Sequence, residues 1–87
     1  MEKIVKIKNK SGLHARPAGM FVKEASKYRS DVEVEFKGKS VNAKSIMGIM
    51  SLGLSKGEEI KIVVKGDDES EAMQAIVDLI ENEFDEK

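Results

Sequence analysis

The chain has 87 residues, with 15 Lys and Arg against 16 Asp and Glu, a formal net charge of −1, one histidine and no cysteine. A chain of this length fits one domain that buries about 60 to 65% of its unfolded surface, so a surface site is expected rather than an internal cavity. Disulfides, thiolate metal sites and cysteine nucleophiles are excluded, and one histidine is too few for an ordinary zinc site. We therefore predict no metal and no cofactor.

The charges are unevenly distributed. Residues 1–65 contain 14 basic and 7 acidic residues, whereas residues 66–87 contain 1 basic and 9 acidic residues. The basic part favours acidic partner surfaces. RNA binding is a minor alternative, because no pair of aromatic residues stands in a basic strand; that alternative predicts strongly salt-dependent binding to RNA.

The start of the chain is too charged for a signal peptide. In addition, no apolar run approaches the ~20 residues of a membrane span. We therefore expect a cytoplasmic protein without membrane insertion.

In chain order, the first predicted element is a short strand over residues 4–8. A helix follows, with apolar residues spaced i, i+3, i+4 and i+7 at Ala18, Phe21, Val22 and Ala25. Residues 32–36 alternate between apolar and charged side chains, and Gly38 offers a turn before a shorter strand over residues 40–43. This pair predicts a β-hairpin.

Residues 45–52 predict a short helix closed by Gly53, with Ser45 at its N-cap. The helix has more apolar residues than can face the core, so we expect Ile49 and Leu52 to be buried and Met47 and Met50 to be exposed.

The fourth predicted strand covers residues 60–65, where Ile60, Ile62 and Val64 alternate with Lys61, Val63 and Lys65. A last helix is predicted to begin at Asp68, which has capping-box spacing to Glu71. Its apolar face comprises Ala72, Ile76, Leu79 and Ile80. Acidic residues near its end oppose the helix dipole, so the last turn is expected to fray.

The order βαββαβα, with strands that are half apolar and half charged, predicts an α+β fold in a single domain over residues 1–87. The expected architecture is an open-faced β-sandwich, in which three helices cover one face of a four-stranded antiparallel sheet. The pattern alone leaves the strand order open.

The segment Gly12-Leu13-His14-Ala15-Arg16-Pro17-Ala18 holds the only histidine and the only proline. An imidazole is largely neutral and nucleophilic near pH 7 and can leave again from phosphorus, which suits reversible phosphoryl transfer. A helix beginning directly after His14 would place unpaired N–H groups beside the ring, and Arg16 adds a fixed positive charge. Pro17 is tolerated in a first helical turn but biases Arg16 away from helical dihedrals.

Taken alone, these three residues favour an ordinary loop histidine, a solvated charge and a helix-start proline over a catalytic site. The full seven-residue segment, however, resembles the active-site sequence of the HPr phosphocarrier proteins of the sugar phosphotransferase system, which share the βαββαβα order. Residues 44–53, Lys-Ser-Ile-Met-Gly-Ile-Met-Ser-Leu-Gly, resemble the regulatory-serine segment of HPr from Gram-positive-type bacteria.

The resemblance implies that His14 accepts a phosphoryl group from Enzyme I and donates it to IIA domains of sugar transporters. Arg16 would be its electrostatic partner, and the N–H groups of Ala15 and Arg16 would bind the phosphate. The protein would be a carrier that forms a phosphohistidine, not a stand-alone enzyme. Ser45 would be phosphorylated by HPr kinase/phosphorylase.

The family also implies where partners dock and which partners they are. The candidate docking residues are Ala15, Gly19, Met20, Lys23, Ile46, Met47 and Met50. A catabolite-control transcription regulator is a further candidate partner, and a monomer is expected. Family members commonly have alanine where this chain has Gly19. One explanation is that glycine lets a partner approach the helix closely. The competing hypothesis is a non-catalytic regulatory module acting through phosphorylated Ser45, like relatives that lack the histidine.

Overall fold

The computed structural model describes residues 1–86, and over this range it confirms the predicted α+β class and the element order. In chain order the elements are β1 (Glu2–Lys6), α1 (Ala15–Ala25), β2 (Asp31–Phe36), β3 (Lys39–Asn42), α2 (Ile46–Ser51), β4 (Glu59–Lys65), α3 (Glu69–Glu81) and a short 3-10 turn, η1 (Glu83–Asp85). None of the helices within residues 1–86 is long and apolar enough to span a membrane.

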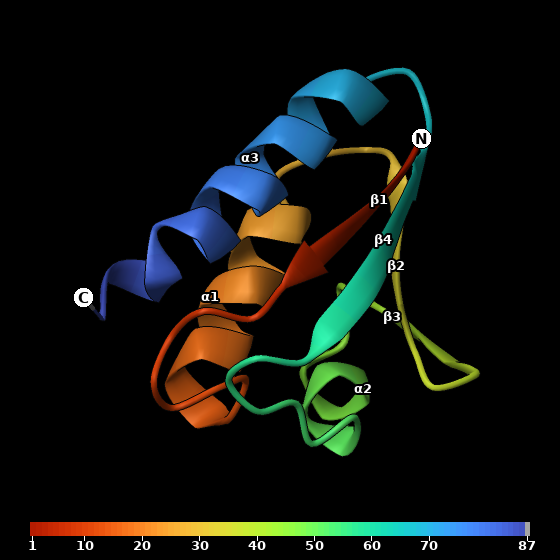
Figure 1. Cartoon of the computed structure of the whole chain (residues 1–87). Coiled ribbons are helices and arrows are strands. Elements are labelled where there is room, and N and C mark those ends of the chain that lie inside the picture. The colour runs from red at the N-terminus through yellow and green to blue at the C-terminus, as the bar shows by residue number, and fades with distance from the viewer. Residues whose placement is uncertain (87) are drawn as a thin grey trace.

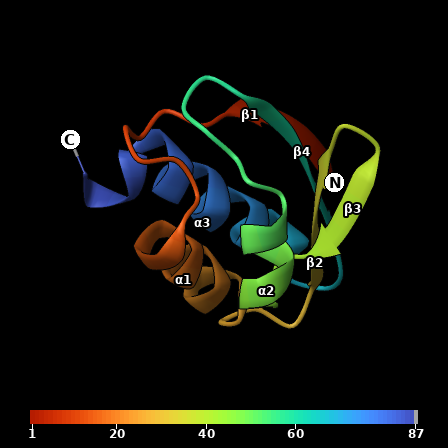
Figure 2. The same cartoon turned by 90° about the horizontal axis from the view of Figure 1, so that it is seen from below.

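The four strands form one antiparallel sheet in the order β1-β4-β2-β3. The three helices lie together on one face of this sheet, as the two perpendicular views show (Figures 1 and 2). The alternation of apolar and charged side chains along the strands explains this arrangement, because successive side chains point to opposite faces of the sheet. Val32 and Val34 are buried, whereas Glu33 between them is exposed. On the open face, Lys61 pairs with Glu2 and Glu35 at 3.4 and 3.6 Å. The open-faced sandwich is therefore as predicted.

The core lies between the sheet and the helices. Phe21 of α1 and Phe84 of η1 are both fully buried, and their rings stack with centroids 6.4 Å apart. Apolar residues from the sheet, from α3 and from the residue after β1 complete the core, among them Ile7, Val34, Ile60, Ile62, Ile76 and Ile80. The core thus joins the start of the chain to its end.

The first strand differs from its predicted range of residues 4–8. The Met1 amine donates to the Val64 carbonyl at 2.7 Å, and the Met1 carbonyl accepts from the Val64 N–H at 2.8 Å, so pairing with β4 begins at the first residue. Beyond Lys6, Ile7 is bound to the loop before β4 through Glu58 and Gly57. Contacts with β4 and with the loop before it set the ends of this strand. The pattern of residues within one strand carries no information about such contacts.

α3 begins where predicted, with Asp68 at its N-cap, but the predicted side-chain cap and the frayed last turn are wrong. Asp68 stands at the N-cap without capping the helix, because its carboxylate instead accepts from the N–H groups of Arg29 and Ser30, each at 2.9 Å. The last turn does not fray into solvent either. A tight turn beyond α3 carries Phe84 into the core, where burial of the ring holds the chain end in place.

Candidate functional site

The loop from Asn9 to His14 is held by backbone contacts on both sides. The Asn9 side-chain amide donates to the Gly12 carbonyl at 2.7 Å, and the Gly12 N–H donates to the Asn9 carbonyl at 3.2 Å. Gly12 has a φ of +70°, and an added Cβ would lie 2.4 Å from the Leu54 carbonyl oxygen. Because Leu13 is buried and donates to that same carbonyl at 3.0 Å, the position of His14 is fixed by its neighbours.

His14 is the N-cap residue of α1. Its backbone is extended, its carbonyl accepts from the Ala18 N–H at 2.8 Å, and its side chain makes no capping hydrogen bond. The ring is therefore exposed and free to react. Within residues 1–86, no acceptor is present for the N–H groups of Ala15 and Arg16, which are first-turn donors that the helix itself leaves unpaired. Ring and donors lie together at the positive end of the helix dipole, a setting that favours a phosphate.

Arg16 and Pro17 belong to the first turn of α1. Arg16 is exposed, and its guanidinium has no ion-pair partner among the described residues. The expectation that Pro17 holds Arg16 away from helical dihedrals was wrong, since Arg16 is helical. Pro17 is the third residue of the helix, where a missing N–H leaves no hydrogen bond unmade, and its ring is buried.

Ser45 is the N-cap of α2, as predicted. Its hydroxyl accepts from the Gly48 N–H at 3.1 Å. The burial predictions for α2 are also confirmed: Ile49 and Leu52 are buried, whereas Met47 is 75% and Met50 41% exposed. Ile46 is 40% exposed as well. We call Ile46, Met47 and Met50 the methionine patch.

The methionine patch lies beside α1. The nearest atom to a Cβ added at Gly19 would be Cδ1 of Ile46, at 3.8 Å, so the two helices approach each other at this point. Figure 2 shows α1 and α2 as neighbours below the sheet. Ala15 and Lys23 are exposed, whereas Gly19 and Met20 are half-buried. The fold therefore places the histidine helix and the serine helix side by side, although their starts are separated by 31 positions in the sequence.

A contact that the sequence reasoning missed joins the chain end to the loop before His14. The Glu86 carboxylate accepts from the Ser11 hydroxyl at 2.5 Å, from the Ser11 N–H at 3.4 Å and from the Asn9 amide at 3.2 Å. The Ser11 hydroxyl is the main reason that the pKa of Glu86 lies below its usual value; the Asn9 amide and the nearby His14 ring act in the same direction. No local pattern marks Glu86, because it lies 75 residues from Ser11.

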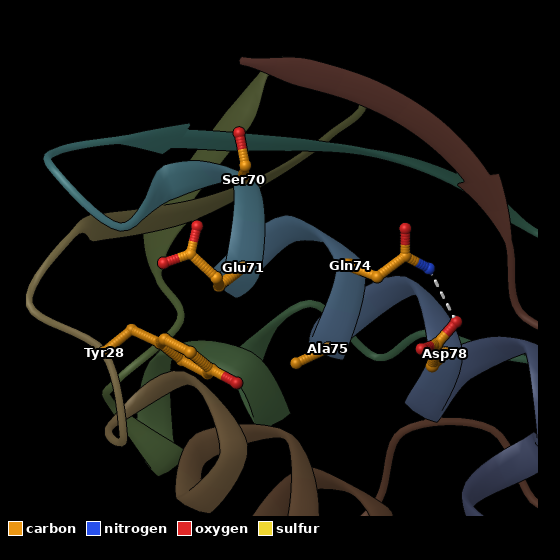
Figure 3. Close-up of a pocket in the computed structure, with 6 residues that line it drawn as sticks. All are labelled: Tyr28, Ser70, Glu71, Gln74, Ala75 and Asp78. Atoms are coloured by element: carbon orange, nitrogen blue, oxygen red, sulfur yellow. Dashed lines mark hydrogen bonds between the residues drawn. The ribbon is translucent and has the colours of Figure 1, made fainter.

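A surface hollow lies elsewhere, between the end of α1 and α3. Its lining includes the Tyr28 ring, Glu71 and Asp78, and Asp78 accepts from the Gln74 amide at 2.8 Å (Figure 3). None of its lining residues belongs to the His14 loop or to the first turn of α1. His14 is exposed and does not line this hollow.

Comparison with known proteins agrees with this geometry. The family model described as "PTS HPr component phosphorylation site" matches residues 1–82. The chain belongs to the HPr family. The match covers every strand and all three α-helices.

Individual relatives include proteins named HPr and one named HPr-like. The HPr-like protein Crh of Halalkalibacterium halodurans is 51% identical over 83 residues, covering 95% of this chain and 99% of the relative. The crystal structure of HPr-C-His from Thermoanaerobacter tengcongensis is 59% identical with a TM-score of 0.97, covering 100% of this chain and 98% of that one. A structure of an HPr dimer from the same organism is 61% identical with a TM-score of 0.79, covering 92% of each chain.

Proposed function

We propose that this HPr-family chain is a phosphocarrier that takes a phosphoryl group onto His14 from Enzyme I and passes it to IIA domains of sugar transporters. The observation that carries the proposal is the exposed His14 ring at the N-cap of α1, beside the unpaired N–H groups of Ala15 and Arg16. To attack phosphorus, the neutral ring has to be unhindered, and the phosphohistidine that forms needs hydrogen-bond donors for its phosphoryl oxygens. One helix end supplies both.

The transfer balances without a cofactor. A neutral nitrogen of the His14 ring attacks phosphorus while the bond from phosphorus to the donor histidine of Enzyme I breaks, and the donor ring leaves as neutral imidazole. The new P–N bond to His14 is later broken in the same way by the acceptor residue of a IIA domain. Charge on the moving group is stabilised by the Arg16 guanidinium and by the first-turn N–H groups, which are already oriented by the helix.

Regulation through Ser45 is the second part of the proposal. The Ser45 side chain lies at the start of α2, next to the methionine patch and near Gly19 of α1. A phosphate there, added by HPr kinase/phosphorylase, would place about −1.5 to −2 charges beside a surface proposed to dock protein partners. Enzyme I and a catabolite-control regulator would then differ in how the phosphate changes their affinity for this surface. The surface comprises the methionine patch and the docking residues on α1, Ala15, Gly19, Met20 and Lys23.

The alternative is a regulatory module that works only through phosphorylated Ser45. The Crh of Bacillus subtilis favours it, since that similar protein is described as a catabolite repression HPr. His14 discriminates between the two functions, because a module working only through Ser45 needs neither an exposed imidazole nor free helix N–H groups beside it.

A direct experiment separates the two functions. The chain is incubated with phosphoenolpyruvate and Enzyme I, and its intact mass is followed before and after acid treatment and after addition of a IIA domain. A carrier gains one acid-labile phosphate and loses it to the IIA domain. A module that gains only an acid-stable phosphate, from ATP and the serine kinase, would contradict the carrier proposal.

We further propose a cytoplasmic carrier that works as a monomer. The residues of the proposed site all come from one chain, which supports this state. The similar HPr dimer makes sedimentation of the unmodified and phosphorylated chain a necessary check.

A further inference from the structure

The chain end has an unusual backbone. Glu83, Phe84 and Asp85 follow one another with φ values of 56°, 52° and 63°, the left-handed region that is disfavoured for residues with a Cβ. Other interactions must therefore stabilise this turn. The buried Phe84 ring stacks on Phe21, and two short-range hydrogen bonds, Asp85 N–H to Asn82 O and Glu86 N–H to Glu83 O, close the turn at 3.0 and 2.9 Å.

The left-handed turn determines where Glu86 lies. After this turn, Glu86 lies beside the loop before α1, at hydrogen-bond distance from Ser11. There the Glu86 carboxylate binds three donors, two on Ser11 and one on Asn9. Asn9 is fully buried, so the carboxylate is attached to a rigid part of the loop. A strained segment held by the core thus delivers one charge to the loop that ends at His14.

We propose that Glu86 is a positioning residue for phosphoryl transfer at His14, and that its charge weakens the hold of His14 on the phosphoryl group. The carboxylate fixes Asn9 and Ser11, and with them the loop that presents the imidazole and leads into the first turn of α1. Its negative charge also opposes the charge of the phosphoryl group. Glu86 therefore keeps the phosphorylated carrier ready to donate. This inference rests on the phosphocarrier function proposed above.

Electrostatics determines the sign of the effect. Glu86 and His14 are neighbours, since the Glu86 carboxylate binds the side chain and the N–H of Ser11, three residues before His14 in the same loop; the lowered pKa of Glu86 agrees with this arrangement. A phosphoryl group on the ring replaces a neutral or positive neighbour by about −1.5 to −2 charges, so the same carboxylate becomes repelled. Both groups are near the surface, which limits the effect and makes it sensitive to salt. Arg16 and the helix N–H groups instead stabilise the phosphorylated ring. The balance between their attraction and the repulsion from Glu86 determines the transfer equilibrium.

Glu86→Gln tests the proposal, because glutamine keeps the shape and an acceptor oxygen but removes the charge. Asp85→Asn is the matched control: it removes the same charge one residue away, is exposed, and asparagine tolerates the left-handed backbone at this position. Ser11→Ala keeps the Glu86 charge and removes one donor to it. Circular dichroism and thermal melts confirm that each variant is folded.

Each protein is equilibrated with Enzyme I at a fixed ratio of phosphoenolpyruvate to pyruvate, and its phosphorylated fraction is measured by intact mass at low and high salt. At low salt, Glu86→Gln should raise the equilibrium constant for phosphorylation by about threefold, and high salt should reduce this rise. Asp85→Asn should raise it clearly less. Ser11→Ala should slow acceptance without the threefold rise, because it loosens the loop and leaves the charge.

The outcomes separate this inference from the function on which it rests. If wild type accepts the phosphoryl group but Glu86→Gln shifts the equilibrium no more than Asp85→Asn, the role of Glu86 is wrong and the carrier function stands. A fall in the equilibrium constant for Glu86→Gln would also overturn the inference. A wild-type chain that accepts no phosphoryl group would overturn both.

Discussion

Two glycines of the site region should respond in opposite ways to the same substitution. Gly19 lies within α1 with ordinary helical geometry, and an added Cβ would meet only Cδ1 of Ile46 at an unstrained 3.8 Å. Gly19→Ala should therefore stabilise the fold by up to about 1 kcal/mol, because alanine loses less backbone entropy in a helix. For a domain of this size, that gain corresponds to a rise in Tm of about 4–8 °C.

Gly12→Ala should destabilise. A Cβ at Gly12 would lie 2.4 Å from the Leu54 carbonyl oxygen and 3.0 Å from the Ser55 Cα, both backbone atoms that no rotamer change can move. The left-handed φ alone costs about 1–2 kcal/mol. Moving the loop to relieve the clash would break the hydrogen bond from Leu13 to Leu54, so the total loss should exceed about 2 kcal/mol.

Urea denaturation of both variants and wild type, with slopes compared to confirm two-state unfolding, measures these changes. Phosphoryl acceptance should be reduced by Gly12→Ala, since this variant moves the loop that carries His14. Equal stability for the two variants would refute the account of the loop. A destabilised Gly19→Ala would show that Gly19 is required by the fold.

Three further outcomes are expected. Phe84→Ala should cost about 3–5 kcal/mol in urea denaturation, because the ring is fully buried; a loss below about 1 kcal/mol would show that the chain end is not anchored. The pKa of Asp68 is lowered, chiefly by the Ser30 hydroxyl, so its contribution to stability is present above the usual carboxyl pKa of about 4 and is lost as pH falls through the folded value. Stability of Asp68→Asn should vary less than that of wild type over this acidic range, and parallel pH curves would contradict the assignment. Ser45→Asp should raise the KM of Enzyme I for the chain at low salt with little change in Tm, because aspartate also caps helices but adds charge beside Met47; an unchanged KM would contradict the proposed docking surface.

The sequence predicts the local features of this protein well. Ser45 as an N-cap, the buried Ile49 and the exposed Met47 all follow from residue type and helical spacing over a few positions. The His14 segment is equally local, because loop, cap and first helical turn occupy seven consecutive residues. Such features need no knowledge of the rest of the chain.

The features that the sequence did not predict depend on distant contacts. Asp68 has the spacing of a helix cap, yet its carboxylate binds backbone groups 38 and 39 residues away. Glu86 lies beyond the last helix, where apolar periodicity has ended, and its partner Ser11 is 75 residues away. Phe84 determines both the end of the fold and the place of Glu86, but nothing in its neighbours indicates a left-handed turn.

The most direct test of the account is the location of the phosphoryl group. Wild type and His14→Ala are incubated with phosphoenolpyruvate and Enzyme I, and intact mass and thermal unfolding are measured on the same samples. Because His14 is exposed and its side chain makes no capping hydrogen bond, His14→Ala should unfold at nearly the same temperature as wild type. Wild type should gain one acid-labile phosphate and His14→Ala none. An acid-labile phosphate on a folded His14→Ala protein would contradict the central claim that the exposed imidazole at the start of α1 is the phosphoryl acceptor.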